Sequence, residues 1–342
     1  MARDHGSDSD GQFAAVLIAQ RTPMMRLRCA VLDDYLNLAL QVADWSKVMD
    51  RVDITVFNQP FASEAAAADA LKDFEIICAM RERTPFPRTL LAALPRLKLL
   101  ITSGMRNAAI DMEAAKAHKV VVCGTQWGRD STAPLTMGLI LELTRNIGRE
   151  NARMHASEPW QKFVGMEIEG RTLGVLGLGK LGSKVSKLAQ AFGMNVIAWS
   201  PNLMPERCKE IGVGYVTKAE LFSNADIVTI HVVLSQRSRG LVAAEDLARM
   251  KPTAYIVNTA RGPIIDEDAL LKVLQQRKIA GAAIDVYAVE PLPVESPFRK
   301  LDNVVLTPHL GYVTEDSFRN HYSQMIDGID AWFKDEPKQR LA

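Results

Sequence analysis

The sequence predicts an α/β protein with two doubly wound parallel sheets and a cleft between them. Short apolar strands alternate with helical patterns in two series, one ending near residue 125 and one starting near residue 171. Such alternation favours parallel sheets joined by crossover helices. The second series opens with a strand that runs directly into three glycines, in "LGVLGLGKLGS" at 173–183, as expected of a strand that turns sharply into a helix.

The composition is that of an ordinary globular protein with a sizeable core. The chain has 342 residues, room for about two domains, and it is 48% hydrophobic and 24% charged. A formal net charge of +1 gives no reason to expect nucleic acid or an anionic membrane as a partner. No apolar run approaches the roughly 20 residues that cross a bilayer, so no membrane partner is expected.

Cysteine usage argues against disulfides and against a metal site. The four cysteines lie far apart and form no CxxC pair or Cys/His cluster. They are expected to be reduced thiols in a cytoplasmic protein with no bound metal. The chain starts with the polar and acidic "MARDHGSDSDG", the wrong flank for a secretory signal. Residues 1–25 are therefore predicted to be a flexible extension.

The first series supplies four strands and two helices. Apolar runs bounded by polar residues or glycine predict the strands, and leucines and alanines at helical spacing predict the helices. The strands are expected at 28–35, 74–80, 97–104 and 119–124, and the helices at 63–74 and 87–97.

A long helix is expected between the two series, over 131–156. Ser131 or Thr132 can cap it, Pro134 suits its first turn, and the apolar residues that follow favour a bridge between domains. The second series then predicts six strands and two helices, and a last helical pattern is expected to return to the first domain. The strands are expected at 171–179, 195–200, 226–232, 254–260, 280–287 and 303–309, and the helices at 181–193, 266–278 and 314–334.

The glycine-rich loop predicts a dinucleotide site. A GxGxxG pattern alone is weak and also suits an ordinary tight loop, but here it closes an apolar strand, opens a helix and is followed by a second strand. In that context backbone amides and the helix N-terminus bind a pyrophosphate. Gly177 permits the turn, Gly179 lets the backbone approach the phosphates, and Gly182 lets the helix lie close to the strand. The loop residues expected to bind the cofactor are Gly177, Leu178, Gly179, Lys180, Leu181 and Gly182.

Three polar residues follow predicted strands of the second series. Arg261 follows "AYIVNTA", Glu290 follows "AIDVYAV", and His309 follows "VVLTP". In open α/β sheets ligands bind at the carboxyl ends of the strands. The three supply an anion clamp, a carboxylate and a proton carrier, although a structural histidine before glycine and a loop-capping glutamate before Pro291 are the alternatives.

These motifs together resemble the D-isomer-specific 2-hydroxyacid dehydrogenase family, which includes glyoxylate/hydroxypyruvate reductases and phosphoglycerate dehydrogenases. The resemblance covers nearly the whole chain from about residue 26 and is clearest over 171–314. It rests on four stretches in the family's order and spacing, which are "GVLGLGKLGSKV", "LARMKPTAYIVNTARGPIIDEDAL", "AGAAIDVYAVEPLP" and "NVVLTPHLGYVTE".

The resemblance implies two Rossmann-like domains, with the cofactor domain inserted in the substrate domain. The substrate (catalytic) domain would comprise residues 26–125 and 312–342, and the NAD(P)-binding domain residues 126–311. The implied function is an oxidoreductase that transfers hydride reversibly between NAD(P)H and a small-molecule 2-oxo acid or D-2-hydroxy acid, without a metal.

The resemblance also implies a role for each polar residue at the strand ends. Arg261 would grip the substrate carboxylate and polarise the carbonyl, and a planar guanidinium suits a carboxylate. His309 would be the general acid in reduction and the general base in oxidation, because histidine exchanges protons near neutral pH. Glu290 would orient His309, and Asp285 would help to hold the nicotinamide carboxamide.

Further residues border the expected cleft. In "TSGMRNAAID" (102–111), the loop at the family's substrate position, backbone amides near Ser103, Gly104 and Met105 could bind the substrate carboxylate. Arg81 and Arg83 also border the cleft, but the sequence favours a solvated surface role for them over substrate binding. The remaining cofactor candidates are Ser200, Asn202, His231, Thr259, Ala260 and Gly311, together with Arg261 and His309.

The residue that ends the second strand bears on the choice of dinucleotide. NAD-binding versions carry an acid there for the adenosine ribose, but this chain has Ser200, twenty-three residues after Gly177. Ser200 and Asn202 can bind a 2′-phosphate, and Arg207 could reach it. No arginine directly follows Ser200. The sequence favours NADP(H) over NAD(H), with use of both left open.

Assembly and a non-enzymatic role complete the expectations. The family pairs through its cofactor domains, and the helix from about 134 to 150 is apolar on more faces than a surface helix needs, which predicts a homodimer. The alternative function is an NAD-sensing binding protein of the corepressor type. The chain shows no long disordered or peptide-docking tail, which argues against that alternative.

Overall fold

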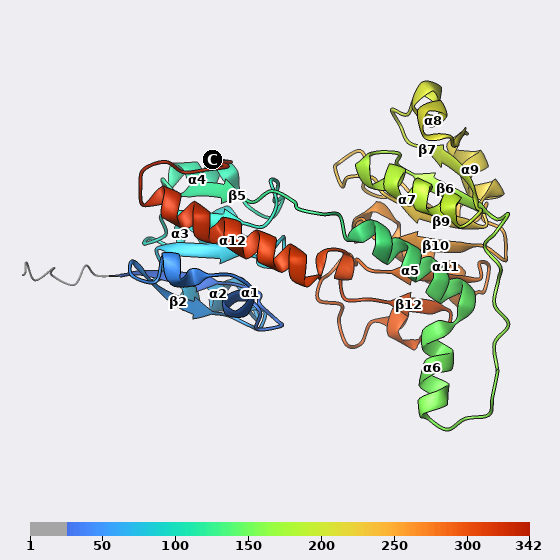
Figure 1. The fold of residues 1–342 in the computed structure, drawn as a ribbon, viewed down its shortest axis with the longest axis horizontal. Coiled ribbons are helices and arrows are strands. Elements are labelled where there is room, and N and C mark those ends of the chain that lie inside the picture. The colour runs from blue at the N-terminus through green and yellow to red at the C-terminus, as the bar shows by residue number, and fades with distance from the viewer. Residues whose placement is uncertain (1–25) are drawn as a thin grey trace, which may run out of the picture.

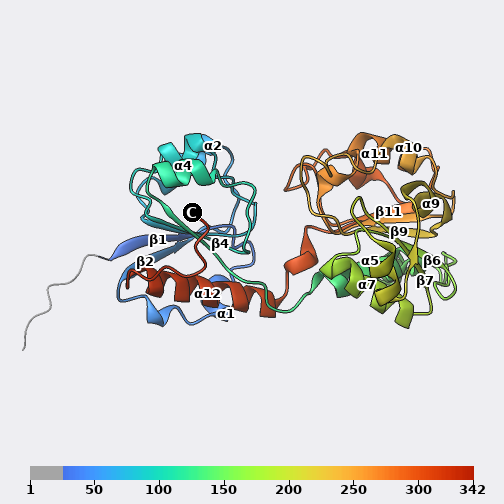
Figure 2. The same ribbon diagram turned by 90° about the horizontal axis from the view of Figure 1, so that it is seen from above.

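Two parallel sheets organise the chain (Figures 1 and 2). The protein is described by a computed structural model covering residues 26–342, so the extension predicted for residues 1–25 lies outside the described residues. Every strand pair in both sheets is parallel. The predicted fold class, two doubly wound α/β units, is confirmed.

The first sheet has five strands in the order β2-β1-β3-β4-β5. Its helices cover both faces: α1 and α12 lie on one, and α2, α3 and α4 on the other (Figure 2). The strands are β1 (Leu27–Val31), β2 (Val52–Val56), β3 (Ile76–Ala79), β4 (Leu99–Thr102) and β5 (Val121–Gly124), and the helices are α1 (Ala39–Val42), η1 (Trp45–Lys47), α2 (Glu64–Leu71), α3 (Arg88–Ala92), α4 (Met112–Ala117) and α12 (Glu315–Trp332).

The second sheet has seven strands in the order β12-β11-β10-β9-β6-β7-β8. The strands are β6 (Thr172–Leu176), β7 (Asn195–Trp199), β8 (Gly214–Tyr215), β9 (Ile227–Ile230), β10 (Tyr255–Asn258), β11 (Gly281–Ile284) and β12 (Val304–Leu306). The helices are α5 (Thr132–Arg145), α6 (Ile147–His155), α7 (Lys180–Ala191), α8 (Pro205–Ile211), α9 (Lys218–Asn224), α10 (Ala244–Leu247), α11 (Glu267–Gln275), η2 (Gly262–Ile264), η3 (Pro297–Lys300) and η4 (Leu310–Tyr312).

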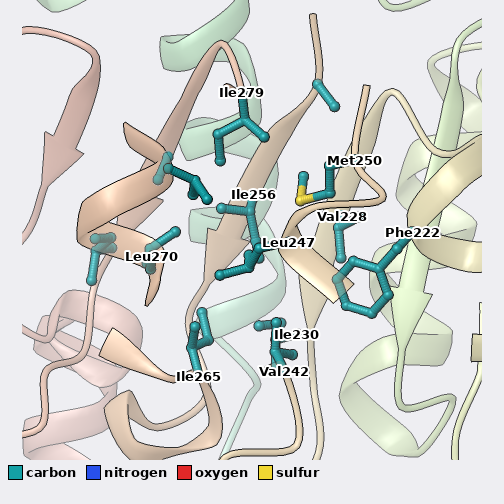
Figure 3. Packing of buried hydrophobic residues seen from close by; sticks show 14 of the residues in the cluster. Phe222, Val228, Ile230, Val242, Leu247, Met250, Ile256, Ile265, Leu270 and Ile279 are labelled. Atoms are coloured by element: carbon teal, nitrogen blue, oxygen red, sulfur yellow. The ribbon is translucent and has the colours of Figure 1, made fainter. Parts of the chain in front are cut away.

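Each face of the second sheet buries its own apolar layer. On one face α9, α10 and α11 pack on the strands, where Phe222, Leu247 and Leu270 meet Val228 and Ile256 (Figure 3). On the other face the apolar side chains of α5 and α7 pack on β6 and its neighbours. Burial of this apolar area is the main stabilising contribution, and it leaves the strand ends as the edge available for ligands.

Two strands were not predicted, and both lie at sheet edges. Among the described strands β2 pairs only with β1, and it alternates buried or half-buried residues with the exposed Asp53 and Thr55. β8 has two residues, both exposed. An edge strand needs one apolar face at most, so neither carries the continuous apolar run on which the strand prediction depends.

The long helix predicted over 131–156 is wrong in its continuity and in its cap. α5 ends at Arg145, and Asn146 adopts the left-handed region (φ 53°) before α6 begins. Asparagine tolerates that conformation better than most residues. The carboxylate of Glu142 accepts the amide of Gly148 at 2.9 Å and so stabilises the start of α6.

The expected capping hydroxyls at the start of α5 bind elsewhere. Ser131 and Thr132 both donate their hydroxyl to the carbonyl oxygen of Gly311, at 2.8 and 2.9 Å. The carboxylate of Asp130 accepts the amide of Thr132 at 3.1 Å instead. The start of α5 is therefore fastened to the turn that precedes α12.

The described residues contain neither a membrane-spanning helix nor a cluster of metal-binding side chains. No helix within residues 26–342 is long and apolar enough to cross a membrane. The same residues contain no group of three or more histidine, cysteine, aspartate or glutamate side chains placed to hold a metal ion. The four cysteines are buried and unpaired by disulfides.

Candidate functional site

Parallel pairing brings three predicted residues to one edge of the second sheet. β10, β11 and β12 are adjacent and parallel, so the segments after them leave the sheet on the same side. Arg261, Glu290 and His309 lie on those segments. The glycine loop follows β6 at the same edge, separated from β10 by β9.

His309 and Glu290 form a close pair. Nδ1 of His309 donates to Oε2 of Glu290 at 2.6 Å, and the histidine and glutamate side chains are 17% and 30% exposed. The other oxygen, Oε1, accepts the amide of Tyr287 at 2.9 Å. Burial alone would raise the pKa of the Glu290 carboxyl, but the hydrogen bond and charge of His309, the Tyr287 amide and the charge of Arg261 outweigh it, and the pKa lies below its usual value. An ionised Glu290 fixes the imidazole orientation and leaves Nε2 as the nitrogen for proton exchange.

A buried carboxylate holds the turn that carries His309. Asp285, fully buried, accepts the hydroxyl of Thr307 (2.6 Å) and the amide of Leu310 (2.7 Å) on one oxygen and the amide of Gly311 (3.0 Å) on the other. Both oxygens therefore serve the turn. The turn carries His309, which adopts a left-handed backbone conformation with φ 54°. The contact of Asp285 and Gly311 with the cofactor stays a prediction.

The glycine loop has the shape that its sequence predicts. Gly177 has φ +103°, and a Cβ there would lie 2.8 Å from the backbone of His231. A Cβ on Gly182 would lie 2.0 Å from the carbonyl oxygen of Gly177, so helix α7 can approach the strand only with glycine at this position. At Gly179 a Cβ would meet open space. The open side is the N-terminal end of α7, where free amides favour an anion.

The three residues of the loop that are not glycine differ in how far they are exposed to solvent. Lys180 is exposed, Leu181 is half-buried, and Leu178 is buried in the apolar layer shared by α5 and α7. The side chain of Leu178 therefore serves the core, and only its backbone is available to a ligand.

Three predicted cofactor residues lie between the glycine loop and Arg261. His231, which follows β9, is buried, its Nε2 lies 2.9 Å from the hydroxyl of Thr229, and its Nδ1 has no partner among the described residues. Burial lowers the pKa of His231 to about 4, so the ring is neutral. The hydroxyl of Thr259 lies 3.0 Å from that of Thr136, and Ala260 donates its amide to Asn258 at 3.0 Å.

The residues considered for a 2′-phosphate lie at the end of β7. Ser200 is half-buried and Asn202 is exposed. Arg207, in the first turn of α8, donates to the hydroxyl of Ser183 on α7 at 3.3 Å and to Glu210 at 2.9 Å. The guanidinium thus lies beside the first turns of the helix that follows the glycine loop.

The predicted substrate loop offers fewer amides than expected. The amide of Ser103 donates to the carbonyl of Ala79 at 3.0 Å, and that of Gly104 donates to the hydroxyl of Thr125 at 3.0 Å. Both amides thus have acceptors within the protein, and substrate binding by this loop stays a prediction. Of the three predicted donors, only the Met105 amide has no acceptor among the described residues.

The solvated surface role predicted for Arg81 and Arg83 is wrong for Arg81, which is buried, and Arg83 is half-buried. Arg81 is 8% exposed, donates to the carbonyl of Ser103 at 3.0 Å, and lies 4.8 Å from the Trp127 ring. Burial lowers its pKa. Arg83 donates to the carbonyl of Asp33 at 3.2 Å, and its guanidinium lies 4.5 Å from the Tyr35 ring. Both side chains are fixed parts of the first sheet's edge.

One residue of this region was not considered at the sequence level. Glu82, between the two arginines, contacts Arg261 across the two sheets, with Nη2 of Arg261 at 3.4 Å from both carboxylate oxygens. Its isolated position in "MRERTPFP" gave no periodic or motif signal. The contact between Glu82 and Arg261 arises only in the folded protein, where the loops after β3 and β10 meet.

Comparison with known proteins places the chain in a family. The family model described as the NAD binding domain of D-isomer specific 2-hydroxyacid dehydrogenases matches residues 137–311. A D-3-phosphoglycerate dehydrogenase of Synechocystis sp. is 39% identical over 75% of this chain and 46% of its own length, and one of Methanocaldococcus jannaschii is 40% identical over 73% and 48%. The chain thus spans about half the length of these curated relatives.

A solved structure agrees with the sequence matches. The phosphoglycerate oxidoreductase of Vibrio cholerae o395 superposes with a TM-score of 0.86 at 33% identity, and the match covers 90% of this chain and 99% of that one. The family model spans half of the chain, and the curated relatives share well over a third of their aligned residues with it. The resemblance predicted from the sequence is confirmed, and the chain belongs to the D-isomer-specific 2-hydroxyacid dehydrogenase family.

Proposed function

We propose that this protein is an oxidoreductase that transfers hydride reversibly between a nicotinamide dinucleotide and a 2-oxo acid or D-2-hydroxy acid. The observation that carries the proposal is the His309–Glu290 pair, 2.6 Å apart, at the same sheet edge as the glycine loop and Arg261. The names of the two D-3-phosphoglycerate dehydrogenases support an enzyme over the corepressor alternative.

The residues present fit a dinucleotide. The positive φ of Gly177, the open space over Gly179 and the tight approach at Gly182 form a backbone cradle at the N-terminus of α7. The backbone of His231 lies against Gly177, and its buried Nδ1 has no hydrogen-bond partner among residues 26–342. In our proposal these residues hold the dinucleotide, which when bound supplies or accepts the hydride at its nicotinamide ring.

The proton chemistry falls to His309. In reduction its Nε2 gives a proton to the carbonyl oxygen as the hydride reaches C2 of the acid, and in oxidation Nε2 takes the hydroxyl proton back. Glu290 accepts the hydrogen bond from Nδ1, so it orients the ring. The turn fixed by Asp285 keeps the histidine at the sheet edge.

Substrate binding is assigned to Arg261 and the amide of Met105. Arg261 carries a planar guanidinium that is 32% exposed on its side chain, and Nη1 is held by the carbonyl of Ala260 at 2.7 Å. This anchoring orients the remaining N–H groups before the acid arrives, which is how a positioned guanidinium lowers the entropic cost of binding.

Dinucleotide choice, assembly and location are further parts of the proposal. We favour NADP(H), because Ser200 brings no carboxylate to the end of β7 and Arg207 lies beside α7. The four unpaired cysteines support a cytoplasmic location. We expect a small-molecule acid as the partner in the site and a second copy of the chain as the partner in assembly.

The apolar surface that supports a homodimer lies on the segment after α5 and not on α5 itself. The apolar residues of α5 are buried against the chain's own second sheet, so they are not spare surface. Beyond Asn146, α6 and the loop after it project from the second sheet (Figure 1). This segment carries four exposed apolar residues, which are Ile147 (55% exposed), Met154 (54%), Trp160 (72%) and Val164 (97%). Exposed apolar side chains on a projecting segment favour a partner surface.

The first prediction concerns proton transfer. His309→Gln should lower the rate of 2-oxo acid reduction by about two to four orders of magnitude, the usual share of general acid catalysis, while the Kd of the dinucleotide changes little. Steady-state kinetics and a fluorescence titration measure the two. The same substitution at the exposed His118 is the control. Turnover within threefold of the unmodified protein would remove His309 from its role.

The second prediction concerns the dinucleotide. Ser200→Asp should lower kcat/KM for NADPH far more than for NADH, because the new carboxylate repels a 2′-phosphate and can bind ribose hydroxyls instead. The measurement compares the two reduced dinucleotides with one good 2-oxo acid. A tenfold preference of the unmodified protein for NADH, unmoved by the substitution, would contradict the assignment.

The third prediction concerns assembly. Light scattering at micromolar concentration should give about twice the chain mass of 37.8 kDa, and Trp160→Glu should shift the protein to the single-chain mass by placing a charge in an apolar contact. Val294→Glu, at another exposed valine, is the matched control and should leave the mass unchanged. A single-chain mass for the unmodified protein would refute the dimer.

A further inference from the structure

Glu82 lies between two arginines that come from different sheets. Its carboxylate is 3.3 Å from Nη2 of Arg81, on its own side, and 3.4 Å from Nη2 of Arg261, across the interface. The Glu82 and Arg261 side chains are 28% and 32% exposed, and that of Arg81 is 10% exposed. The three charges therefore form one cluster, shielded in part from water, at the place where the loops after β3 and β10 meet.

The same cluster borders the predicted substrate loop. Arg81 donates to the carbonyl of Ser103, and a Cβ on Gly104 would lie 2.4 Å from its Nη1. Through its chain neighbour Arg81, Glu82 is thus connected to the loop that offers the Met105 amide. Its own carboxylate contacts Arg261, the arginine assigned to the substrate carboxylate. An acid that binds Arg261 must lie close to Glu82.

The contact with Arg261 is of the kind that a substrate can share or displace. At 3.4 Å to both oxygens it is longer than a well-formed N–H···O bond. A carboxylate that approaches Arg261 in a better aligned, two-pronged geometry makes a stronger contact. Glu82 therefore does not prevent a substrate carboxylate from binding Arg261, but it neutralises part of the positive charge of that guanidinium.

The charges of the cluster decide how many anionic groups it accepts. Arg81 and Arg261 contribute two positive charges and Glu82 removes one, which leaves one for the carboxylate next to the reacting carbon. Arg83 is engaged separately, with the carbonyl of Asp33 and the Tyr35 ring. A second anionic group on the substrate would meet Glu82 with no cation in the cluster left to balance it.

We propose that Glu82 is a specificity-determining residue, which restricts the site to 2-oxo or 2-hydroxy acids whose only anionic group is the reacting carboxylate. Acids with a neutral or cationic side chain are accepted, whereas acids with a second carboxylate or a phosphate ester are rejected by the like charge of Glu82. The inference rests on the proposed function, because it takes Arg261 as the carboxylate-binding residue.

The test compares two acids that differ only in charge, 2-oxoglutarate and its 5-amide. In the unmodified protein the amide should have the higher kcat/KM, and Glu82→Gln should raise the value for 2-oxoglutarate relative to the amide by about tenfold, the size of one partly screened like-charge contact. Glu82→Asp keeps the charge and should keep the preference. Glu113→Gln, an exposed acid on α4 of the same sheet, is the matched control and should change neither value.

A second readout separates this inference from the proposed function. Calorimetry gives the Kd of both acids with the oxidised dinucleotide, which cannot reduce them. A Glu82→Gln protein whose acid-to-amide ratio is unchanged, in turnover and in Kd, overturns the role of Glu82 while the proposed function stands. A shifted Kd ratio without any turnover supports the role and overturns the reaction. Absence of binding by both acids to both proteins overturns the two together.

Discussion

The carboxylate of Asp285 is the contact on which the rest of the site depends. A carboxylate removed from water is costly unless hydrogen bonds replace its solvation. Here the hydroxyl of Thr307 and the amides of Leu310 and Gly311 do so, at 2.6 to 3.0 Å. Burial still raises the pKa of Asp285, more than these bonds lower it. The turn so held places His309, in a left-handed conformation, where Glu290 can reach Nδ1.

The same turn connects the two sheets. The carbonyl oxygen of Gly311 accepts the hydroxyls of Ser131 and Thr132 at the start of α5, so both segments that cross between the sheets meet at this point. From there α12 runs along the first sheet (Figure 2). Asp330 on this helix accepts a hydrogen bond from Arg51 at 2.9 Å. The position of His309 is thus set by contacts to both parts of the molecule, and the Glu82–Arg261 contact adds a second connection between them.

How far the sequence predicts the structure depends on how local the signal is. The strands with continuous apolar runs, the glycine loop and the order of Arg261, Glu290 and His309 all follow from short stretches whose meaning does not depend on distant residues. The edge strand β2 and the break at Asn146 were missed, because an edge strand carries half the apolar signal and a single left-handed residue interrupts no periodic pattern. The competition among side-chain and backbone groups for hydrogen-bond partners could not be predicted from the sequence.

That competition decides the roles of several side chains. The hydroxyls of Ser131 and Thr132, the amides of Ser103 and Gly104 and the carboxylate of Asp285 each had a plausible use in the sequence. Their partners come from 21 to 180 positions away. The contact of Glu82 with such a distant partner, Arg261, could likewise not be predicted from the sequence.

The central claim, that Glu290 acts through His309, is tested most directly by a double-mutant cycle on kcat/KM with His309→Gln and Glu290→Gln. If Glu290 acts through His309, Glu290→Gln causes a large loss in the unmodified protein and almost none when His309 is already replaced. Equal losses in both backgrounds would contradict it.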